Sequence, residues 1–362
     1  MFRLLSCALA LALTGVISAT VAADDPVSSN VRFNREIIRI LQRRCLSCHS
    51  PGGLSMPLSN YRDVRDWSRA IREEVVEQRM PPSTAAPGYG QFENALGLTF
   101  RETTTLLAWL DGGMPRGDEK DLPAPIDMTS ITRSDPAADL HFDLPEQSIP
   151  ALEELMIRRV TIASGLTRDR LVSRVVLRPG SRALMRGAVI YEGADERSWI
   201  GAWLPWQHTM AAPSGHAFRL PKSATLTLVL YYRGGDDAAT DRSSVDVYFA
   251  DNPSALETVH VDADQGRGRQ TLAASITVWA LQTIVQQGTR SLELRVTRPD
   301  SSVEVLLWMP TVRPEWPNAL LLQKPVTLPA GSILTVSTKG PDSASRRESV
   351  ILSAWQEPTR SR

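Results

Sequence analysis

The last two thirds of the chain constrain the fold most, because short apolar–polar alternations follow one another there. Residues 170–180, 183–193 and 224–235 alternate in this way, and turn signals such as Arg-Pro-Gly and Arg-Gly-Gly-Asp-Asp follow them. Short alternating runs divided by turn residues are typical of antiparallel strands. We therefore predict that this part folds as two stacked antiparallel β-sandwiches.

The first third has a helical pattern instead. Apolar residues recur at helical spacing in residues 33–45, 63–78 and 99–111. Thr99 and Glu102 have the spacing of a capping box at the start of the third segment. This pattern predicts a small all-α domain, so the expected fold class is an α + β multidomain protein.

Polar, proline-bearing sequence after this helical third predicts a linker. The expected division is a signal peptide at 1–23, a helical domain at 24–122, a linker at 123–145, and β-sandwiches at 146–262 and 263–362.

The N-terminus has the features of a cleaved export signal. Arg3 supplies the positive charge, residues 4–20 are apolar, and small residues predict cleavage near Ala23. No later stretch approaches the ~20 apolar residues of a membrane span, so we expect a periplasmic protein without a span. Forty basic residues balance forty acidic ones, so no net charge favours binding to nucleic acid.

Only two cysteines remain after the signal peptide, in the stretch Cys45-Leu-Ser-Cys48-His49. A disulfide would not require the histidine, a thioredoxin-like pair would need an α/β context, and structural zinc would need a fourth ligand. Covalent attachment of one haem c accounts for each residue: the two thiols bond the haem, and His49 is the first axial ligand of its iron.

A second axial ligand is expected from methionine. Met80 is preferred because it precedes two prolines that stiffen the loop after a predicted helix. Met56 is the alternative, although it lies close to His49 in the sequence, and Met114 lies beyond the third helix. Each of these methionines could instead fill the apolar core.

The segment 31–122, with its Cys-x-x-Cys-His and Arg-Met-Pro-Pro motifs, resembles the class I cytochrome c domain of exported bacterial proteins. Such domains often precede a copper type II, ascorbate-dependent monooxygenase module of the peptidylglycine hydroxylase class. Segments of the β part, including 176–193 and 226–250, resemble that module in the same order. The resemblance implies a haem domain joined to a double β-sandwich.

The resemblance also implies two copper sites held by histidines, but this chain departs from that pattern. The positions that match the copper ligands hold Arg186, Gly187, Tyr231, Tyr232, Thr283 and Val285. Outside the haem motif the histidines are His141, His208, His216 and His260. No two of these have the spacing of a local copper pair, and only His208 and His216 form a loose cluster, so copper is not expected.

The function predicted from the sequence is one-electron transfer through haem, with a redox protein of the periplasm as partner and no catalytic residues assigned. The β part would then serve as a binding or docking unit. The alternative is a copper-dependent monooxygenase that receives electrons from its own haem domain.

Overall fold

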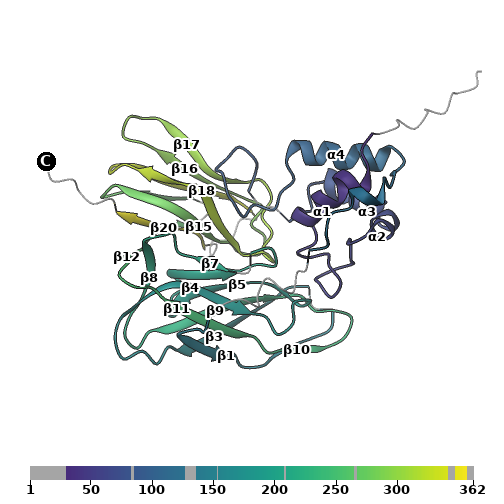
Figure 1. The fold of residues 1–362 in the computed structure, drawn as a ribbon. Helices are drawn as coiled ribbons and strands as arrows, with labels where there is room; N and C mark the ends of the chain where they lie inside the picture. The colour runs from purple at the N-terminus through teal and green to yellow at the C-terminus, as the bar shows by residue number, and fades with distance from the viewer. Residues whose placement is uncertain are drawn as a thin grey trace, which may run out of the picture.

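The computed structural model describes residues 30–82, 85–126, 136–152, 154–207, 209–264, 267–340 and 347–356. The predicted signal peptide lies outside these ranges. A helical segment lies beside two β parts, which pack one above the other (Figure 1). Within the described ranges there are 20 β-strands, β1 to β20, and only four α-helices, α1 to α4.

The helices of the N-terminal segment are short. They are the π-helix η1 (Phe33–Ile37), α1 (Ile38–Arg44), α2 (Tyr61–Asp66), α3 (Ser68–Val76), α4 (Phe100–Asp111) and the 3-10 helix η2 (Glu119–Asp121). The capping box of α4 is confirmed, since the Thr99 hydroxyl accepts the Glu102 amide at 3.2 Å and the Glu102 carboxylate accepts the Thr99 amide at 2.9 Å. The helix expected over 63–78 is divided, because the chain leaves helical geometry at Trp67.

These helices pack around a small core of their own. Phe33, Leu106 and Trp109 are almost fully buried in it. The indole of Trp109 donates a 3.0 Å hydrogen bond to the carbonyl of Pro115, which ties the end of α4 to the chain that follows it.

The first β part contains 12 strands. They are β1 (Leu140–Asp143), β2 (Gln147–Ile149), β3 (Met156–Ala163), β4 (Arg170–Arg178), β5 (Met185–Glu192), β6 (Ser198–Trp203), β7 (Met210–Ala211), β8 (His216–Leu220), β9 (Thr225–Tyr232), β10 (Ala239–Asp241), β11 (Ser244–Phe249) and β12 (Ser254–Ala255). One sheet has the order β1-β11-β4-β8-β12, with β7 beside β4, and another has the order β3-β9-β5-β6. Strand β1 lies within the segment that we expected to be a linker.

The second β part is one hydrogen-bonded sheet of eight strands. They are β13 (Glu257–Asp264), β14 (Arg267–Thr271), β15 (Ile276–Ile284), β16 (Ser291–Thr297), β17 (Val303–Met309), β18 (Asn318–Leu328), β19 (Ile333–Lys339) and β20 (Arg347–Gln356). Their order is β17-β16-β19-β14-β13-β20-β15-β18. Strand β13 begins before residue 263, where we placed the start of this part.

The predicted fold class, with its small all-α class I cytochrome c domain, is wrong. The chain is mostly β, and the helical segment is not self-contained. Its loop between α3 and α4 is built into the second β part: Phe92 forms a β-bridge with Leu322 and is buried in that core. The Asn94 side chain donates to the carbonyl of Ala319 at 2.5 Å and accepts the amide of Leu321 at 2.9 Å.

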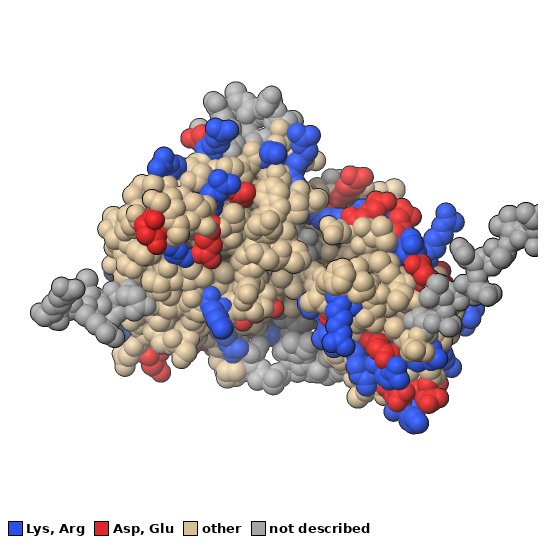
Figure 2. Space-filling model, turned by 90° about the horizontal axis from the view of Figure 1, so that it is seen from above, with Lys and Arg blue, Asp and Glu red and all other residues tan. Residues whose placement is uncertain are grey.

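Charged side chains gather over the helical end of the molecule, and the face of the β part in the same view has wide uncharged areas (Figure 2). Both signs are interleaved there; Arg72 pairs with Asp111 at 2.8 Å and Arg79 with Glu74 at 2.8 Å. In the described ranges no helix is both long and apolar enough to cross a membrane.

Candidate functional site

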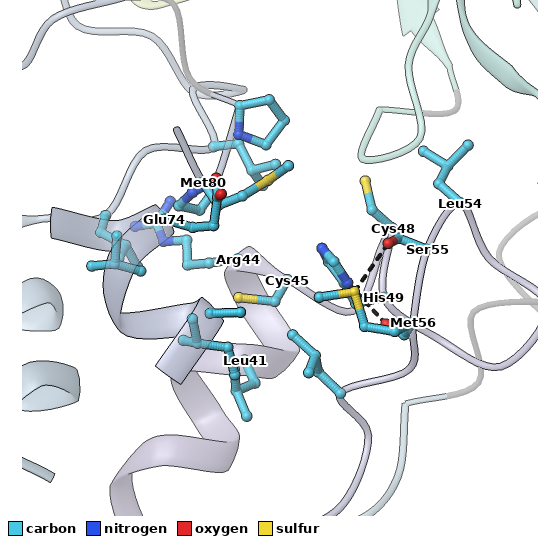
Figure 3. Close-up of a pocket in the computed structure, with 18 of the residues that line it drawn as sticks. Leu41, Arg44, Cys45, Cys48, His49, Leu54, Ser55, Met56, Glu74 and Met80 are labelled. Carbon is cyan, nitrogen blue, oxygen red and sulfur yellow. Dashed lines mark hydrogen bonds between the residues drawn. The ribbon is translucent and has the colours of Figure 1, made fainter. Parts of the chain in front are cut away.

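The Cys-x-x-Cys-His motif lies directly after helix α1. The amide of Cys45 still donates to the Leu41 carbonyl, at 2.8 Å, and the amides of Cys48 and His49 both donate to the carbonyl of Cys45, at 3.1 and 2.9 Å. This tight turn directs both thiols and the imidazole toward one cavity (Figure 3).

The cavity has a volume of about 360 Å³, which is within the usual range for small-molecule and cofactor sites. Most of its walls are apolar. The apolar residues that line it include Leu41, Leu54, Leu58, Ile71, Val75, Leu96, Leu98 and Leu106. Apolar walls of this kind exclude water and keep the dielectric constant low around a bound group.

The orientation of His49 is fixed by a hydrogen bond of 2.9 Å between its Nδ1 and the carbonyl of Met56. A carbonyl can only accept, so Nδ1 carries the proton and Nε2 has a free lone pair. Burial lowers the pKa of His49 and so favours the neutral imidazole. A histidine that donates one ring N–H to a backbone carbonyl is the usual arrangement of a metal ligand.

Both cysteines of the motif are free thiols. Burial raises the pKa of Cys45 to about 12 and that of Cys48 to about 11, so both are protonated at neutral pH. Across the described ranges, no three His, Cys, Asp or Glu side chains are grouped so that they could hold a metal ion directly. The two thiols and the free Nε2 of His49 face the same cavity, which is the arrangement needed to hold a haem through two sulfurs and an imidazole.

Met80 and Met56 both line the cavity, whereas Met114 packs against the core of the helical segment. In Figure 3 Met80 lies above Cys45, and His49 lies to its right. The position of Met80 is set by α3, since its amide donates to the Glu74 carbonyl at 3.1 Å. The Met56 sulfur already accepts a 3.0 Å hydrogen bond from Ser55, which favours Met80 as the free thioether.

One wall of the cavity comes from the β parts, and the sequence patterns did not identify it. This wall contains Arg186, Arg233 and Trp316. Arg186 is buried and lies over the ring of Trp316, with its guanidinium carbon 6.0 Å from the ring centroid. The sequence did contain one indication of this wall: Arg186 is a charged residue within the apolar strand β5, and arginine is rarely buried unless it is paired.

The other histidines do not meet at this cavity. His141 pairs with Asp246 at 2.6 Å, His216 lies against the ring of Trp355 with centroids 4.2 Å apart, and His260 is on β13. His208, the other member of the loose cluster, lies outside the described residues.

Comparison with known proteins identifies no family for this chain. No protein-family model matches it, and no curated protein matches it. Among solved structures, it is similar to the protein VP54 of PBCV-1 fitted into a reconstruction of the virophage Sputnik, with 6% identity over 61% of this chain and 95% of that chain and a TM-score of 0.24. The major capsid protein P2 of bacteriophage PM2 is 7% identical over 61% of this chain and 99% of that chain, with a TM-score of 0.23. Vicilin from Capsicum annuum is 8% identical over 57% of this chain and 77% of that chain, with a TM-score of 0.15. At these TM-scores the similarity does not amount to a shared fold.

Proposed function

We propose that this protein is an exported, monohaem c-type electron-transfer protein of the periplasm, in which haem c is bonded to Cys45 and Cys48. One observation carries the proposal: both thiols, the free Nε2 of His49 and the thioether of Met80 face one apolar cavity. When bound, haem would supply a one-electron couple, and His49 and Met80 would be the protein ligands of its iron.

The protein's own residues explain how this couple would be held. The hydrogen bond from His49 to the Met56 carbonyl prevents the imidazole from rotating, and the buried site keeps it neutral. The Met80 sulfur is a soft ligand of the kind that raises a haem potential. Because Arg44 is paired with Glu102 at 3.1 Å, and Glu74 with Arg79, these charged lining residues are neutralised within the helical segment.

Co-expression with a haem-attachment system tests the proposal. We expect one iron per chain, haem that stays attached after denaturation, and an N-terminus that begins near residue 24. Replacing Cys45 and Cys48 together with alanine should abolish the attachment. A full-length protein that leaves such a host without covalent haem would contradict the proposal.

The assignment of the second axial ligand is tested by a matched pair of variants. Met80→Ala should remove the low-spin, methionine-ligated spectrum and lower the midpoint potential, because loss of the thioether disfavours the ferrous form. Met56→Ala should retain the methionine-ligated spectrum and the midpoint potential of the wild type. If Met56→Ala changed the spectrum and Met80→Ala did not, Met56 would be the ligand.

A redox protein of the periplasm is the expected partner of this function. The interleaved charges at the helical end offer no large single-sign patch on the face seen in Figure 2. We therefore propose a partner that docks without strong electrostatic steering, so that the rate of electron exchange should depend only weakly on salt concentration.

A further inference from the structure

The β wall of the cavity carries two positive charges that the helical segment does not neutralise. Arg186 lies on β5, and Arg233 directly follows β9, the neighbour of β5 in the same sheet. The β5–β9 register shifts between Met185 and Gly187, so Arg186 sits at a β-bulge. Bulges turn a side chain out of the regular alternation and are frequent next to functional sites.

The close packing of this wall is built around Arg186. A side chain on the adjacent Gly187 would bring its Cβ within 2.5 Å of Pro317, so only glycine allows the 316–317 segment to lie this near β5. That segment places the Trp316 ring beside the Arg186 guanidinium. The bulge and the glycine together hold a cation at the cavity surface.

Arg186 has few partners for a buried cation. Only 9% of its surface is exposed, and among the described residues its guanidinium donates one hydrogen bond, to the carbonyl of Ala183 at 3.2 Å. A guanidinium has five N–H donors. Within the described ranges neither Arg186 nor Arg233 forms an ion pair with a carboxylate, whereas the other charged lining residues, Arg44 and Glu74, both do.

A buried guanidinium such as that of Arg186 is unfavourable at an apolar cavity unless an anion joins it, and the exposed Arg233 adds a second positive charge at the same wall. Buried charges in proteins are normally paired, and arginine is the side chain best suited to a carboxylate because its planar fork can bind both oxygens. The cavity therefore fits a ligand that is largely apolar and carries carboxylates on the side that faces the β wall.

We propose that Arg186 and Arg233 bind the propionate carboxylates of the haem, so that the first β part completes the haem site. This inference rests on the proposed function. It gives the β part a role other than docking, because its two arginines would set the charge around the haem. Positive charge near the haem favours the ferrous form, so loss of either arginine should lower the midpoint potential.

The test is redox titration of the full-length, haem-loaded protein at about pH 8, where carboxylates are ionised. We expect Arg186→Gln and Arg233→Gln to keep the covalent haem and the axial ligands but to shift the reduction equilibrium about tenfold, or about 59 mV. Arg186→Lys should restore part of the shift. Arg219→Gln is the control, because its side chain is 65% exposed and pairs with Asp169 on the surface.

Several outcomes would overturn the inference. If both glutamine variants kept their covalent haem and had the same midpoint potential as the Arg219→Gln control, the inference would be overturned and the proposed function would stand. If the wild-type protein carried no covalent haem, both the inference and the proposed function would be overturned. Because Arg233 is exposed, Arg233→Gln tests the idea without disturbing the core. If the arginines took a free anion instead, inorganic phosphate at constant ionic strength would move the wild-type midpoint toward that of Arg186→Gln, and this result would also overturn the inference.

Discussion

Replacing Phe92 with alanine tests whether the helical segment and the second β part unfold as one unit. Phe92 belongs to the loop between α3 and α4, yet it pairs with Leu322 and is only 7% exposed within the core of the second β part. Truncation of a buried phenylalanine costs about 3–5 kcal/mol. We expect about 3 kcal/mol here, the lower limit of that range, because Phe92 lies at the edge of the core.

Urea unfolding followed by two probes measures this effect. With an m value of about 3 kcal/mol per M, the transition should move down by about 1 M urea. Haem absorbance reports on the helical segment and tryptophan fluorescence mainly on the β parts, and both transitions should move together. Phe100→Ala is the matched control, because its side chain is 85% exposed and its loss should change stability by no more than about 0.5 kcal/mol.

The reasoning would be refuted if Phe92→Ala moved the transitions no further than Phe100→Ala does. A shift in the fluorescence transition alone would show that the loop is attached to the β part without coupling it to the helices.

Three further predictions concern the β parts. Gly187→Ala should destabilise the protein by about 1–3 kcal/mol in urea, because the new Cβ would lie 2.5 Å from Pro317. Asp241→Asn should cost about 2–3 kcal/mol by the same measurement, because the buried carboxylate accepts hydrogen bonds from Tyr232, Ser243 and Ser181 at 2.9, 2.6 and 2.6 Å. The hydrogen bond with Asp246 raises the pKa of His141, and the stability this contributes is present below the unfolded pKa of about 6.5 and lost as the pH rises through the folded pKa. His141→Gln should therefore cost more stability at about pH 5 than at about pH 8, and equal losses would contradict the assignment.

Local patterns in the sequence predicted the features that depend on neighbouring residues. The alternation in residues 224–235 corresponds to strand β9, and the Thr99–Glu102 spacing to the cap of α4. The Cys-x-x-Cys-His motif and Met80 needed only their immediate surroundings to be recognised, and the structure brings them to one cavity. In each case the physical cause lies within a few residues of the feature.

Contacts between distant parts of the chain could not be predicted in this way. Asn94 forms hydrogen bonds with Ala319 and Leu321, which are more than 200 residues away in the sequence. The loop that contains Asn94 has no hydrophobic periodicity from which this contact could be predicted. The error in fold class has the same origin, because nothing in the helical pattern indicates that part of the segment completes a β core. Similarly, strict alternation along β5 cannot show which way Arg186 points, since a bulge interrupts the register there.

The same bulge bears on the departure from the copper-ligand pattern that the resemblance drawn from the sequence implies. At the position where that resemblance implies a copper ligand, this chain has Arg186, and the side chain faces the cavity that contains Cys45, Cys48 and His49. A guanidinium is always charged and cannot bind a metal ion, but it is well suited to a carboxylate. Arg186 therefore offers no metal ligand, but it places a cation at the wall of this cavity. On the proposed function, the first β part would therefore complete the haem site.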